Sequence, residues 1–303
     1  MAISRSQLVK ELEPGLNALF GLEYKRYENQ HAEIYATESS DRAFEEEVML
    51  SGFANAQVKG EGSGVSFDEA QETFTARYTH ETVALAFAIT EEAIEDNLYD
   101  RLASRYTKAL ARSMSNAKQV KAVEPLIQGL PTTDGFDSGD GVSLFNTSHP
   151  TVAGVFANTL ATQADLNETS LEQSLIDIGQ MSDERGLRIA ARGVKMIIPS
   201  ELQFTAERLM KSQGRTGTAD NDINSIVSMG MIPQGYRVNN YLTDSDAFYI
   251  ITDVPNGMKM FNRAPLTTAM EGDFDTGNVR YKARERYSFG VSDPRGIFGV
   301  EGV

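Results

Sequence analysis

The residue types that carry most catalytic and metal-binding chemistry are scarce in this chain. It has no cysteine and three histidines, His31, His80 and His149, which lie far apart in the sequence. The lack of cysteine excludes disulfides, thiol nucleophiles, iron–sulfur clusters and cysteine-ligated zinc. A histidine-rich metal centre would require all three histidines to converge in space. We therefore expect no metal site and no cofactor.

Three short segments approach known active-site motifs without completing them. The segment that begins at His80 starts like the helix signature of zinc proteases, but Ala84 stands where the second histidine ligand would be. The glycine-rich segments 60–64 and 214–218 lack the Gly-Lys-Ser/Thr ending of a phosphate-binding loop, and Glu61 would repel phosphate. We interpret the His80 segment as ordinary strand residues. The sequence thus predicts no catalytic residue.

Three aspartates lie in a glycine-rich loop, where carboxylates could bind a hard cation. They are Asp134, Asp137 and Asp140, and their spacing of three residues is not that of an EF-hand loop. No closing glutamate follows at the required distance. We interpret the segment as a solvated acidic loop. Elsewhere, two carboxylates could pair as in a glycosidase, but 43 acidic residues make such a pair unspecific.

A basic pattern near the C-terminus is more distinctive. On a β-strand, where side chains alternate between faces, four cations would share one face; they are Arg280, Lys282, Arg284 and Arg286. They would repel one another unless acids face them. The face is either simply solvated or part of an ion-pair seam between chains. For the second case, the candidate acids are Glu91, Glu92 and Glu95 at a helix start, and the acidic hairpin that carries Lys59 and Glu61.

The overall charge limits the partners of the protein. Acidic residues number 43 and basic residues 28, so the net charge of the 303-residue chain is −15. Tight binding to nucleic acid through the bulk of this surface is disfavoured, as is adhesion to anionic membranes. The N-terminus has no apolar segment of signal-peptide length, and the longest apolar run, 83–89, is far too short to span a membrane.

The elements that would position these residues begin with an arm and a long hairpin. In residues 1–45, a short helix can start after Ser4 or Ser6 and is expected to be interrupted by Pro14-Gly15. This arm has too few apolar residues for a core of its own, so it must pack on another domain or chain. In residues 46–90, two β-prone flanks surround a glycine-rich tip. A projecting hairpin and a flexible surface loop both fit that pattern.

A long amphipathic helix follows. Thr90 is a good N-cap, and Pro125 and Gly129 are expected to end the helix. Its apolar stripe comprises Ile94, Leu98, Leu102, Tyr106, Leu110, Met114 and Ala117. Further helices are predicted at 171–181 and 201–210, and strands at 194–199, 236–242, 248–252, 258–261 and 279–291. Helices and strands without a regular βαβ period indicate an α+β fold.

The order of these elements resembles that of the major capsid proteins of tailed bacteriophages, which have the Hong Kong 97-like fold. The segments that carry the resemblance are SDRAFEEEV (40–48), RYTHET (77–82), ITEEAIEDNLYD (89–100), RYTKALARS (105–113), LFNTSHP (144–150) and GYRVNNYL (235–242). The resemblance covers nearly the whole chain. These motifs are structural rather than catalytic, so the resemblance implies a structural protein and no enzyme.

The resemblance also implies a domain layout. This layout comprises an N-terminal arm at 1–45, an extended loop at 46–88, a peripheral domain with a long spine helix at 89–190, an axial domain at 191–272, and the C-terminal strands of the peripheral domain at 273–303. In the namesake of the fold, a lysine of the extended loop is crosslinked to an asparagine of a neighbouring subunit. Lys59 is the lysine near the tip here, and no motif matches the asparagine.

By the same resemblance, the partners are other copies of the chain in hexamers and pentamers that enclose double-stranded DNA. Portal and scaffolding proteins, and possible decoration or cement proteins, complete the set. The arm begins near Met1, so a separate scaffolding protein, or none, is implied. The protein would be made in the bacterial host cytoplasm and reside in the virion capsid. Two alternatives are an encapsulin-like shell with a protein cargo and, with least support, a soluble enzyme.

Overall fold

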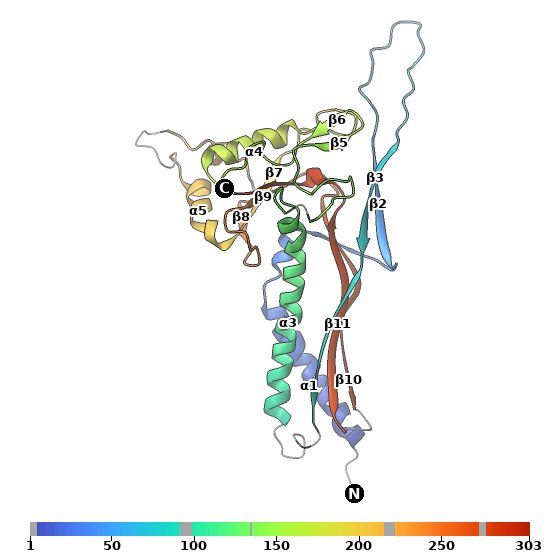
Figure 1. The fold of residues 1–303 in the computed structure, drawn as a ribbon, viewed down its shortest axis with the longest axis vertical. Helices are drawn as coiled ribbons and strands as arrows, with labels where there is room; N and C mark the ends of the chain where they lie inside the picture. Colours follow the sequence, from blue (N-terminus) through green and yellow to red (C-terminus); the bar gives the residue numbers. More distant parts are fainter. Residues whose placement is uncertain (1–4, 91, 93–98, 134, 215–221, 273–276) are drawn as a thin grey trace.

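The molecule has an elongated leg, a head at one end of it and a hairpin that projects beyond the head (Figure 1). The structure is a computed structural model. It describes residues 5–90, 92, 99–133, 135–214, 222–272 and 277–303. The leg consists of two helices on a long sheet, and the head is a second sheet with shorter helices around it.

The sheet of the leg has the strand order β1-β10-β11-β4. Its strands are β1 (Ala36–Ser39), β4 (Glu81–Ile89), β10 (Met258–Gly272) and β11 (Val279–Val291). β1 is parallel to β10, and the other pairs are antiparallel. β11 has the bounds that its alternating sequence predicts. β10 is much longer than the predicted 258–261, because the β10–β11 ladder resumes after register shifts around Pro265.

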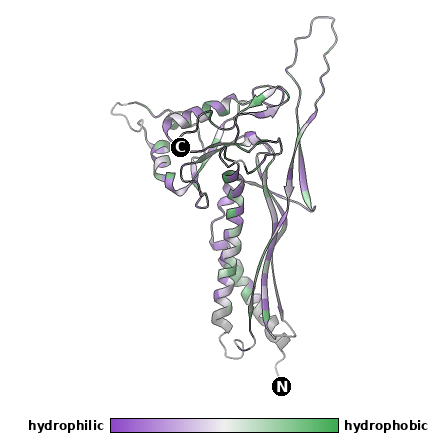
Figure 2. Ribbon diagram, viewed as in Figure 1, coloured by the Kyte–Doolittle hydropathy of each residue, from purple (hydrophilic) through white to green (hydrophobic). Residues whose placement is uncertain are grey.

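Two helices, α1 (Arg5–Arg26) and α3 (Tyr99–Gln128), cover one face of this sheet. Phe20 of α1, Leu110 and Met114 of α3, and Tyr281 and Ala283 of β11 form a common buried core. Apolar and polar residues are interleaved along these elements, as an amphipathic helix or half-buried strand requires (Figure 2). The leg is therefore a two-layer structure with one apolar interior.

The prediction that Pro14-Gly15 interrupts the first helix was wrong. α1 runs through Pro14 without a break. A proline inside a helix costs about 3 kcal/mol, because it removes a backbone hydrogen bond and crowds the preceding turn. Burial of Leu16 and Phe20 against α3 and the sheet offsets that cost. The arm packs on the leg of its own subunit.

The predicted long helix is α3, with a different end. At about 1.5 Å per residue, its 30 residues span about 45 Å. It passes through Pro125 and ends at Gln128, just before Gly129. Leu110 and Met114 are buried as predicted, whereas Tyr106 is about half exposed at the edge of the stripe. The predicted start and the side chains of Ile94, Leu98 and Leu102 lie outside the described part.

The head is built on a sheet of order β12-β9-β7-β8. Its strands are β7 (Gly193–Ile198), β8 (Tyr236–Val238), β9 (Phe248–Thr252) and β12 (Ile297–Val300). Around it lie α4 (Glu168–Gln180), α5 (Gln203–Lys211), α6 (Ser225–Met229), the short ladder β5 (His149–Thr151) and β6 (Gly154–Phe156), and the 3-10 turns η2 (Ser200–Leu202) and η3 (Pro294–Gly296). The helices at 171–181 and 201–210 and the strands at 194–199 and 248–252 are thus confirmed, and the strand at 236–242 is shorter than predicted.

Head and leg share a core at the C-terminal end of α3. Leu126 of α3, Tyr249 of β9, Tyr287 of β11 and Ile297 of β12 are buried in one cluster. The 3-10 turn η1 (Gln30–Glu33) reinforces the junction, because the Lys195 ammonium of β7 contacts the Glu33 carboxylate at 2.7 Å. Because one cluster contains residues of both sheets, head and leg are parts of a single packed unit.

The hairpin consists of β2 (Phe44–Leu50) and β3 (Glu72–Thr79), which pair antiparallel and are joined by residues 51–71. It projects away from the head, as the hairpin interpretation of the sequence predicts (Figure 1). After His80 the chain continues as β4, which belongs to the leg sheet. Residues 46–88 therefore form two parts, a projecting hairpin and a strand of the leg. The expected boundary at 272–273 lies at the end of β10, which pairs with β11 in the leg sheet.

Candidate assembly interface

The tip of the hairpin exposes several large apolar side chains. Val58 is fully exposed and Phe67 is 97% exposed, and Leu50, Phe53 and Val65 are each more than half exposed. Scattered apolar residues are normal on a protein surface, but a cluster on one projection indicates an interaction site. The described residues of the same subunit leave most of this apolar surface exposed, which makes the tip a candidate contact with another chain.

The hairpin is also strongly acidic. Between residues 44 and 79 there are seven carboxylates and two basic side chains, so the segment carries a net charge of 2 − 7 = −5. Lys59 and Glu61, both predicted contact residues, are exposed at its tip. Four of the seven carboxylates lie within 4.0 Å of a cation, namely Glu45, Glu46, Glu47 and Asp68. Among the described residues, Glu61, Glu69 and Glu72 have no ion pair, and Glu61 lies at the tip. An approaching partner would need a basic surface.

The root of the hairpin is fixed to the leg by a buried lysine. Lys259 of β10 contacts Glu47 of β2 at 2.6 Å and Glu38 of β1 at 3.2 Å. Burial alone would lower the pKa of Lys259, but the hydrogen bonds to the two carboxylates outweigh it and raise the pKa. This triad holds the start of the hairpin against the leg sheet.

His80 marks the point where the hairpin becomes part of the leg. Its Nδ1 lies 2.9 Å from Ser288 Oγ and its Nε2 lies 2.9 Å from Ser40 Oγ. Burial and then the nearby Arg286 lower the pKa of His80, which keeps the ring neutral. β3 and β4 are separated by this single residue, so the hairpin has a short, well-supported attachment.

The outer face of the leg sheet carries the predicted row of cations. Arg280, Lys282 and Arg284 are exposed and Arg286 is partly so, while alternate residues of β11 are buried. Successive members of the row are about 6.8 Å apart, as expected for alternate strand residues. Their cross-strand neighbours on β4 are Thr82, Ala84, Ala86 and Ala88. On β10 the neighbours are Glu271 opposite Arg280 and then the small residues Ala269, Thr267 and Ala264. The small neighbours of Lys282, Arg284 and Arg286 leave these long basic side chains as the main feature of this part of the face.

Arg280 has a partner of its own, but intramolecular acids do not account for the other three members of the basic row. Within the part of the chain that the structure describes, no ion pair involves Lys282, Arg284 or Arg286. Arg286 instead donates hydrogen bonds to the backbone oxygens of His80 and Ala43 at 3.4 Å. The hairpin tip projects from the opposite end of the molecule and cannot reach the row (Figure 1). The hairpin tip and the basic row of β11 are therefore far apart within one copy. They could contact each other only between different copies.

The helix start is the second predicted source of acids. Glu92 is helical and exposed, whereas Glu91 and Glu95 lie outside the described residues. The amino-acid pattern does not single out the exposed apolar residues of the tip as a group. Their β-prone pattern is equally typical of a strand with a buried face, so no signal in the sequence identified them.

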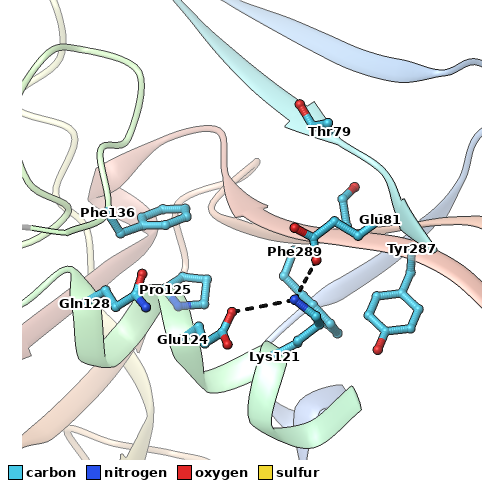
Figure 3. Close-up of a pocket in the computed structure, with 10 residues that line it drawn as sticks. Thr79, Glu81, Lys121, Glu124, Pro125, Gln128, Phe136, Tyr287 and Phe289 are labelled. Atoms are coloured by element: carbon cyan, nitrogen blue, oxygen red, sulfur yellow. Dashed lines mark ion pairs between the residues drawn. The ribbon is translucent and has the colours of Figure 1, made fainter. Parts of the chain in front are cut away.

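A small polar pocket lies between α3 and the beginning of β4 (Figure 3). Its volume is about 150 Å³, and Lys121 crosses it to contact Glu81 at 2.5 Å and Glu124 at 4.0 Å. The hydrogen bond to Glu81 raises the pKa of Lys121. Because its charged groups are already paired with one another, the pocket presents no nucleophile and base in a productive arrangement.

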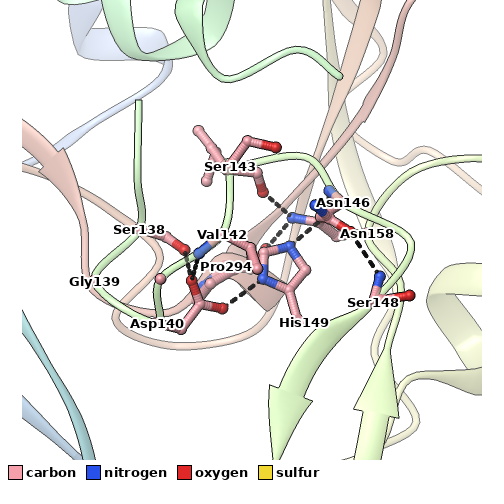
Figure 4. A network of polar contacts seen from close by, with 12 residues as sticks. Ser138, Gly139, Asp140, Val142, Ser143, Asn146, Ser148, His149, Asn158 and Pro294 are labelled. Atoms are coloured by element: carbon pink, nitrogen blue, oxygen red, sulfur yellow. Dashed lines mark hydrogen bonds and ion pairs between the residues drawn. The ribbon is translucent and has the colours of Figure 1, made fainter. Parts of the chain in front are cut away.

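The interpretation of the candidate cation loop as solvated holds for Asp137 and is wrong for Asp140. The carboxylate of Asp140 is buried and contacts His149 Nδ1 at 2.6 Å, while Asp137 is exposed and Asp134 lies outside the described residues (Figure 4). No group of three or more histidine or acidic residues suited to a metal ion occurs within the described ranges. His31 pairs with Gln119 and His80 with two serines, so the three histidines do not converge.

Comparisons with known proteins agree with this architecture. A family model described as phage capsid protein matches residues 72–300. A search of curated proteins gave no match. Across the described residues, no helix is both long and apolar enough to cross a membrane.

Three solved structures share the fold. They are a virus-like particle from Pyrococcus furiosus (11% identity, 94% of this chain and 98% of that chain covered, TM-score 0.53), the capsid of Myoviridae phage XM1 (12%, 89% and 89%, 0.53) and the capsid of an empty GTA particle (14%, 90% and 89%, 0.52). At such identities the likeness concerns the fold alone. Together with a family model that covers most of the chain, it shows that this chain belongs to the phage capsid protein family and is a capsid shell protein with the Hong Kong 97-like fold.

Proposed function

We propose that this chain is the major head protein of a tailed bacteriophage, which assembles through hexamers and pentamers into an icosahedral shell around double-stranded DNA. The observation that supports this most directly is the projecting hairpin, whose apolar tip is left largely exposed by the described residues of its own subunit. A thin shell needs elements that bury surface only against neighbours. In this proposal the leg is the peripheral domain and the head is the axial domain.

The role is structural and not enzymatic, and the subunit resides in the virion after synthesis in the cytoplasm of the bacterial host. Portal and scaffolding proteins, and possible decoration or cement proteins, are its further partners. Contact with the packaged DNA is weak in this proposal, because a chain with a net charge of −15 attracts few phosphates. Weak attraction leaves the genome free to slide during packaging.

Within the shell, the basic row of β11 contacts the acidic hairpin of a neighbouring copy. The charges are complementary, and the row lacks acidic partners among the described residues of its own chain apart from the pairing at Arg280. Each exposed ion pair contributes only about 0–1 kcal/mol. A closed shell repeats every ion pair many times. The small free energies of the individual pairs therefore add up to a large contribution to assembly.

The test is the charge reversal Arg284→Glu. The variant should fold normally but form fewer shells, as measured by circular dichroism and sedimentation velocity. Arg105→Glu, which makes the same charge change on an exposed position of α3, serves as the control for net charge. Normal shells from Arg284→Glu would remove the basic row from the assembly proposal.

A second candidate function is a cellular protein compartment of encapsulin type. The likeness to the virus-like particle from Pyrococcus furiosus, which covers nearly all of both chains, favours it. Negative-stain electron microscopy of purified particles, with assays of their nucleic acid and protein content, separates the two functions. DNA-filled particles support the viral shell, and particles with a protein cargo support the compartment. A small monomeric species on size exclusion would argue against both.

A further inference from the structure

The leg sheet ends at β4, and the free edge of this strand lacks the features that usually protect an edge. Within the described ranges, β4 pairs with β11 and with no other strand. It runs for nine residues without a bulge, and its sequence has no lysine and no proline. Roughly half of the backbone N–H and C=O groups of such a strand point away from its partner. Proteins usually cover or interrupt an edge of this kind, because another strand can pair with it.

The two faces of this edge differ in character. On the outer face, β4 presents the small exposed residues Ala84, Ala86 and Ala88. They leave room for the basic side chains of β11, one strand spacing of about 4.8 Å away, to extend toward the edge. On the opposite face, Leu85 is 45% exposed and Tyr106 of α3 is 49% exposed. A strand that covers this edge should therefore be acidic on one face and apolar on the other.

One segment of the hairpin has this alternating pattern. Residues 65–70 are exposed, and none of them makes a backbone–backbone hydrogen bond among the described residues. In an extended conformation, Val65 and Phe67 lie on one face and Asp68 lies on the other, where Glu72 continues the row. At about 3.3 Å per residue the segment would span about 20 Å, which fits within the length of about 30 Å of β4. Its length and its pattern therefore match the free edge.

Contacts within the subunit leave one backbone edge of the segment free. In a strand, successive residues direct their N–H and C=O groups to opposite edges. Glu69, which follows Phe67 on the apolar face, uses both groups within its own subunit: its N–H donates to Asp68 Oδ1 at 3.0 Å, and its backbone oxygen accepts a hydrogen bond from Arg185. The backbone groups of residues 66, 68 and 70 have no such partner in the described part of the chain. The even-numbered residues thus form the edge that is available for pairing.

The acids of the segment also remain accessible. The side chain of Asp68 is 42% exposed; it accepts a hydrogen bond from the Ala54 N–H at 2.6 Å and meets Arg185 only at 4.0 Å. Glu72 has no ion pair among the described residues and is exposed. The other limb of the hairpin, residues 53–58, is apolar in part but contains no acid. Charge complementarity with the basic row therefore selects the limb at 65–70.

We propose that residues 65–70 of one copy add as a fifth strand to the free edge of β4 in a neighbouring copy. Val65 and Phe67 then cover the exposed apolar side chains beside α3, and Asp68 and Glu72 face the basic row across the small residues of β4. Backbone hydrogen bonds supply the affinity, and the alternating side chains supply the specificity. The inference rests on the proposed function, because it specifies the contact between copies on which the shell depends.

A peptide tests the pairing without assembly. A dye-labelled peptide of residues 63–73 is added to the unassembled full chain at low ionic strength, and binding is followed by fluorescence anisotropy. Because a strand pairs with an edge through alternate residues, N-methylation of the even-numbered residues of 65–70 should weaken binding at least tenfold, whereas N-methylation of the odd-numbered residues should leave it nearly unchanged. Absence of binding by the unmodified peptide, or equal effects of the two methylation patterns, would overturn the proposal.

Engineered disulfides test the same contact in assembled shells. The chain has no cysteine, so every disulfide formed must join introduced positions. A disulfide needs Cα atoms about 4.4–6.8 Å apart. One cysteine is placed in the segment and one on the outer face of β4, as Ser66→Cys or Ala70→Cys combined in turn with Ala84→Cys, Ala86→Cys or Ala88→Cys. At least one combination should give a ladder of crosslinked subunits on a non-reducing gel.

The matched controls carry the first cysteine on the other limb, as Ala54→Cys or Ala56→Cys, both at exposed positions. They should give no ladder with the same β4 positions. Shells that form normally without any crosslink from positions 66 or 70 would overturn the proposal and leave the proposed function intact. Specific peptide binding by a chain that forms no shells would have the opposite meaning: the edge contact stands and the proposed function fails.

Discussion

At the scale of single residues, buried polar side chains determine how the leg and the arm hold together. Glu285 lies on the buried face of β11 and contacts the Lys118 ammonium at 3.1 Å, with the Tyr24 hydroxyl at 3.5 Å. Burial raises the pKa of Glu285, and Lys118 opposes the rise. His31 of η1 is likewise buried, and its Nδ1 lies 3.0 Å from the Gln119 amide nitrogen. Each contact joins two of the three parts of the leg, namely the N-terminal segment, the sheet and α3.

His31 should make the subunit less stable in acid. Burial and the nearby Lys118 lower the pKa of His31 to about 4. Above pH 6.5, the approximate pKa of His31 in the unfolded chain, the side chain is neutral in both the folded and the unfolded state, and the stability is fully present. Between about pH 6.5 and pH 4 His31 gains a proton only in the unfolded chain, so the free energy of unfolding decreases as the pH falls. The loss by pH 5 should be about 2 kcal/mol. Urea denaturation of the unassembled protein at several pH values measures it.

The variant His31→Asn provides the control, because its side-chain oxygen can accept the Gln119 hydrogen bond without titrating. The free energy of unfolding of this variant should decrease less between pH 7 and pH 5 than that of the wild type. The difference in stability between the two proteins should therefore be smaller at pH 5 than at pH 7. Parallel curves for the two proteins would show that His31 does not contribute to acid sensitivity.

The sequence predicted the placement of exposed charges better than that of buried ones. The alternation of Arg280 to Arg286 follows from strand geometry alone, and the structure has it. Glu285 and Asp140 are buried because of Lys118 and His149, partners that lie 167 and 9 positions away. Pairing of this kind depends on tertiary contacts, and residue type alone favours a solvated carboxylate.

At the scale of elements, long periodic segments were predicted well and irregular ones were not. β9 and β11 have the predicted bounds because their patterns are unbroken. β10 was predicted too short, since Pro265 interrupts its pattern and a bulge accommodates the proline. α1 continues through Pro14 because Leu16 and Phe20 are buried against α3 and the sheet. The local sequence does not reveal these tertiary contacts.

The packing of α3 on the sheet can be tested by truncation. Leu110 is 4% exposed, and Leu110→Ala should lower the free energy of unfolding by about 2–5 kcal/mol because it leaves a cavity. Val120→Ala, on the exposed side of the same helix, should change it by less than about 0.5 kcal/mol. Equal effects of the two substitutions in chemical denaturation would contradict the assigned buried face.

Substitution of two glycines in one loop distinguishes the cost of backbone strain from the cost of lost contact with the hairpin. Gly139 and Gly141 both have positive φ, but only at Gly139 would a Cβ meet β3. Gly141→Ala should cost about 1 kcal/mol from backbone conformation alone. Gly139→Ala should cost clearly more in thermal unfolding and increase proteolysis of the hairpin. Equal costs would mean that the loop does not support β3.

At the scale of the whole molecule, the subunit has a projecting hairpin whose exposed side chains are candidates for contact with other subunits. The resemblance to capsid proteins identified the architecture, because an arm, a hairpin and a long helix in this order are specific. It could not show which residues project: the seven carboxylates of the hairpin and the apolar tip become recognisable as one group only in the structure.

The apolar tip should matter for assembly and not for folding. Phe67 is 97% exposed, so Phe67→Ser should change the stability of the unassembled subunit by less than about 0.5 kcal/mol. Burial of such a side chain against a neighbour contributes about 1.5–3 kcal/mol. The variant should therefore need roughly tenfold or more protein to form shells, measured by light scattering. Val303→Ser, an exposed apolar position at the C-terminus, should assemble like the wild type.

The single residue between β3 and β4 has a mechanical consequence. A neighbour that pulls on the hairpin tip pulls along the axis of β4, whose hydrogen bonds to β11 lie across that direction from Glu81 to Ile89. Such a pull loads these bonds simultaneously, in shear, instead of opening them one after another. The leg sheet would thus resist tension in the shell wall, as pressure from tightly packed contents would create, with many bonds sharing the force.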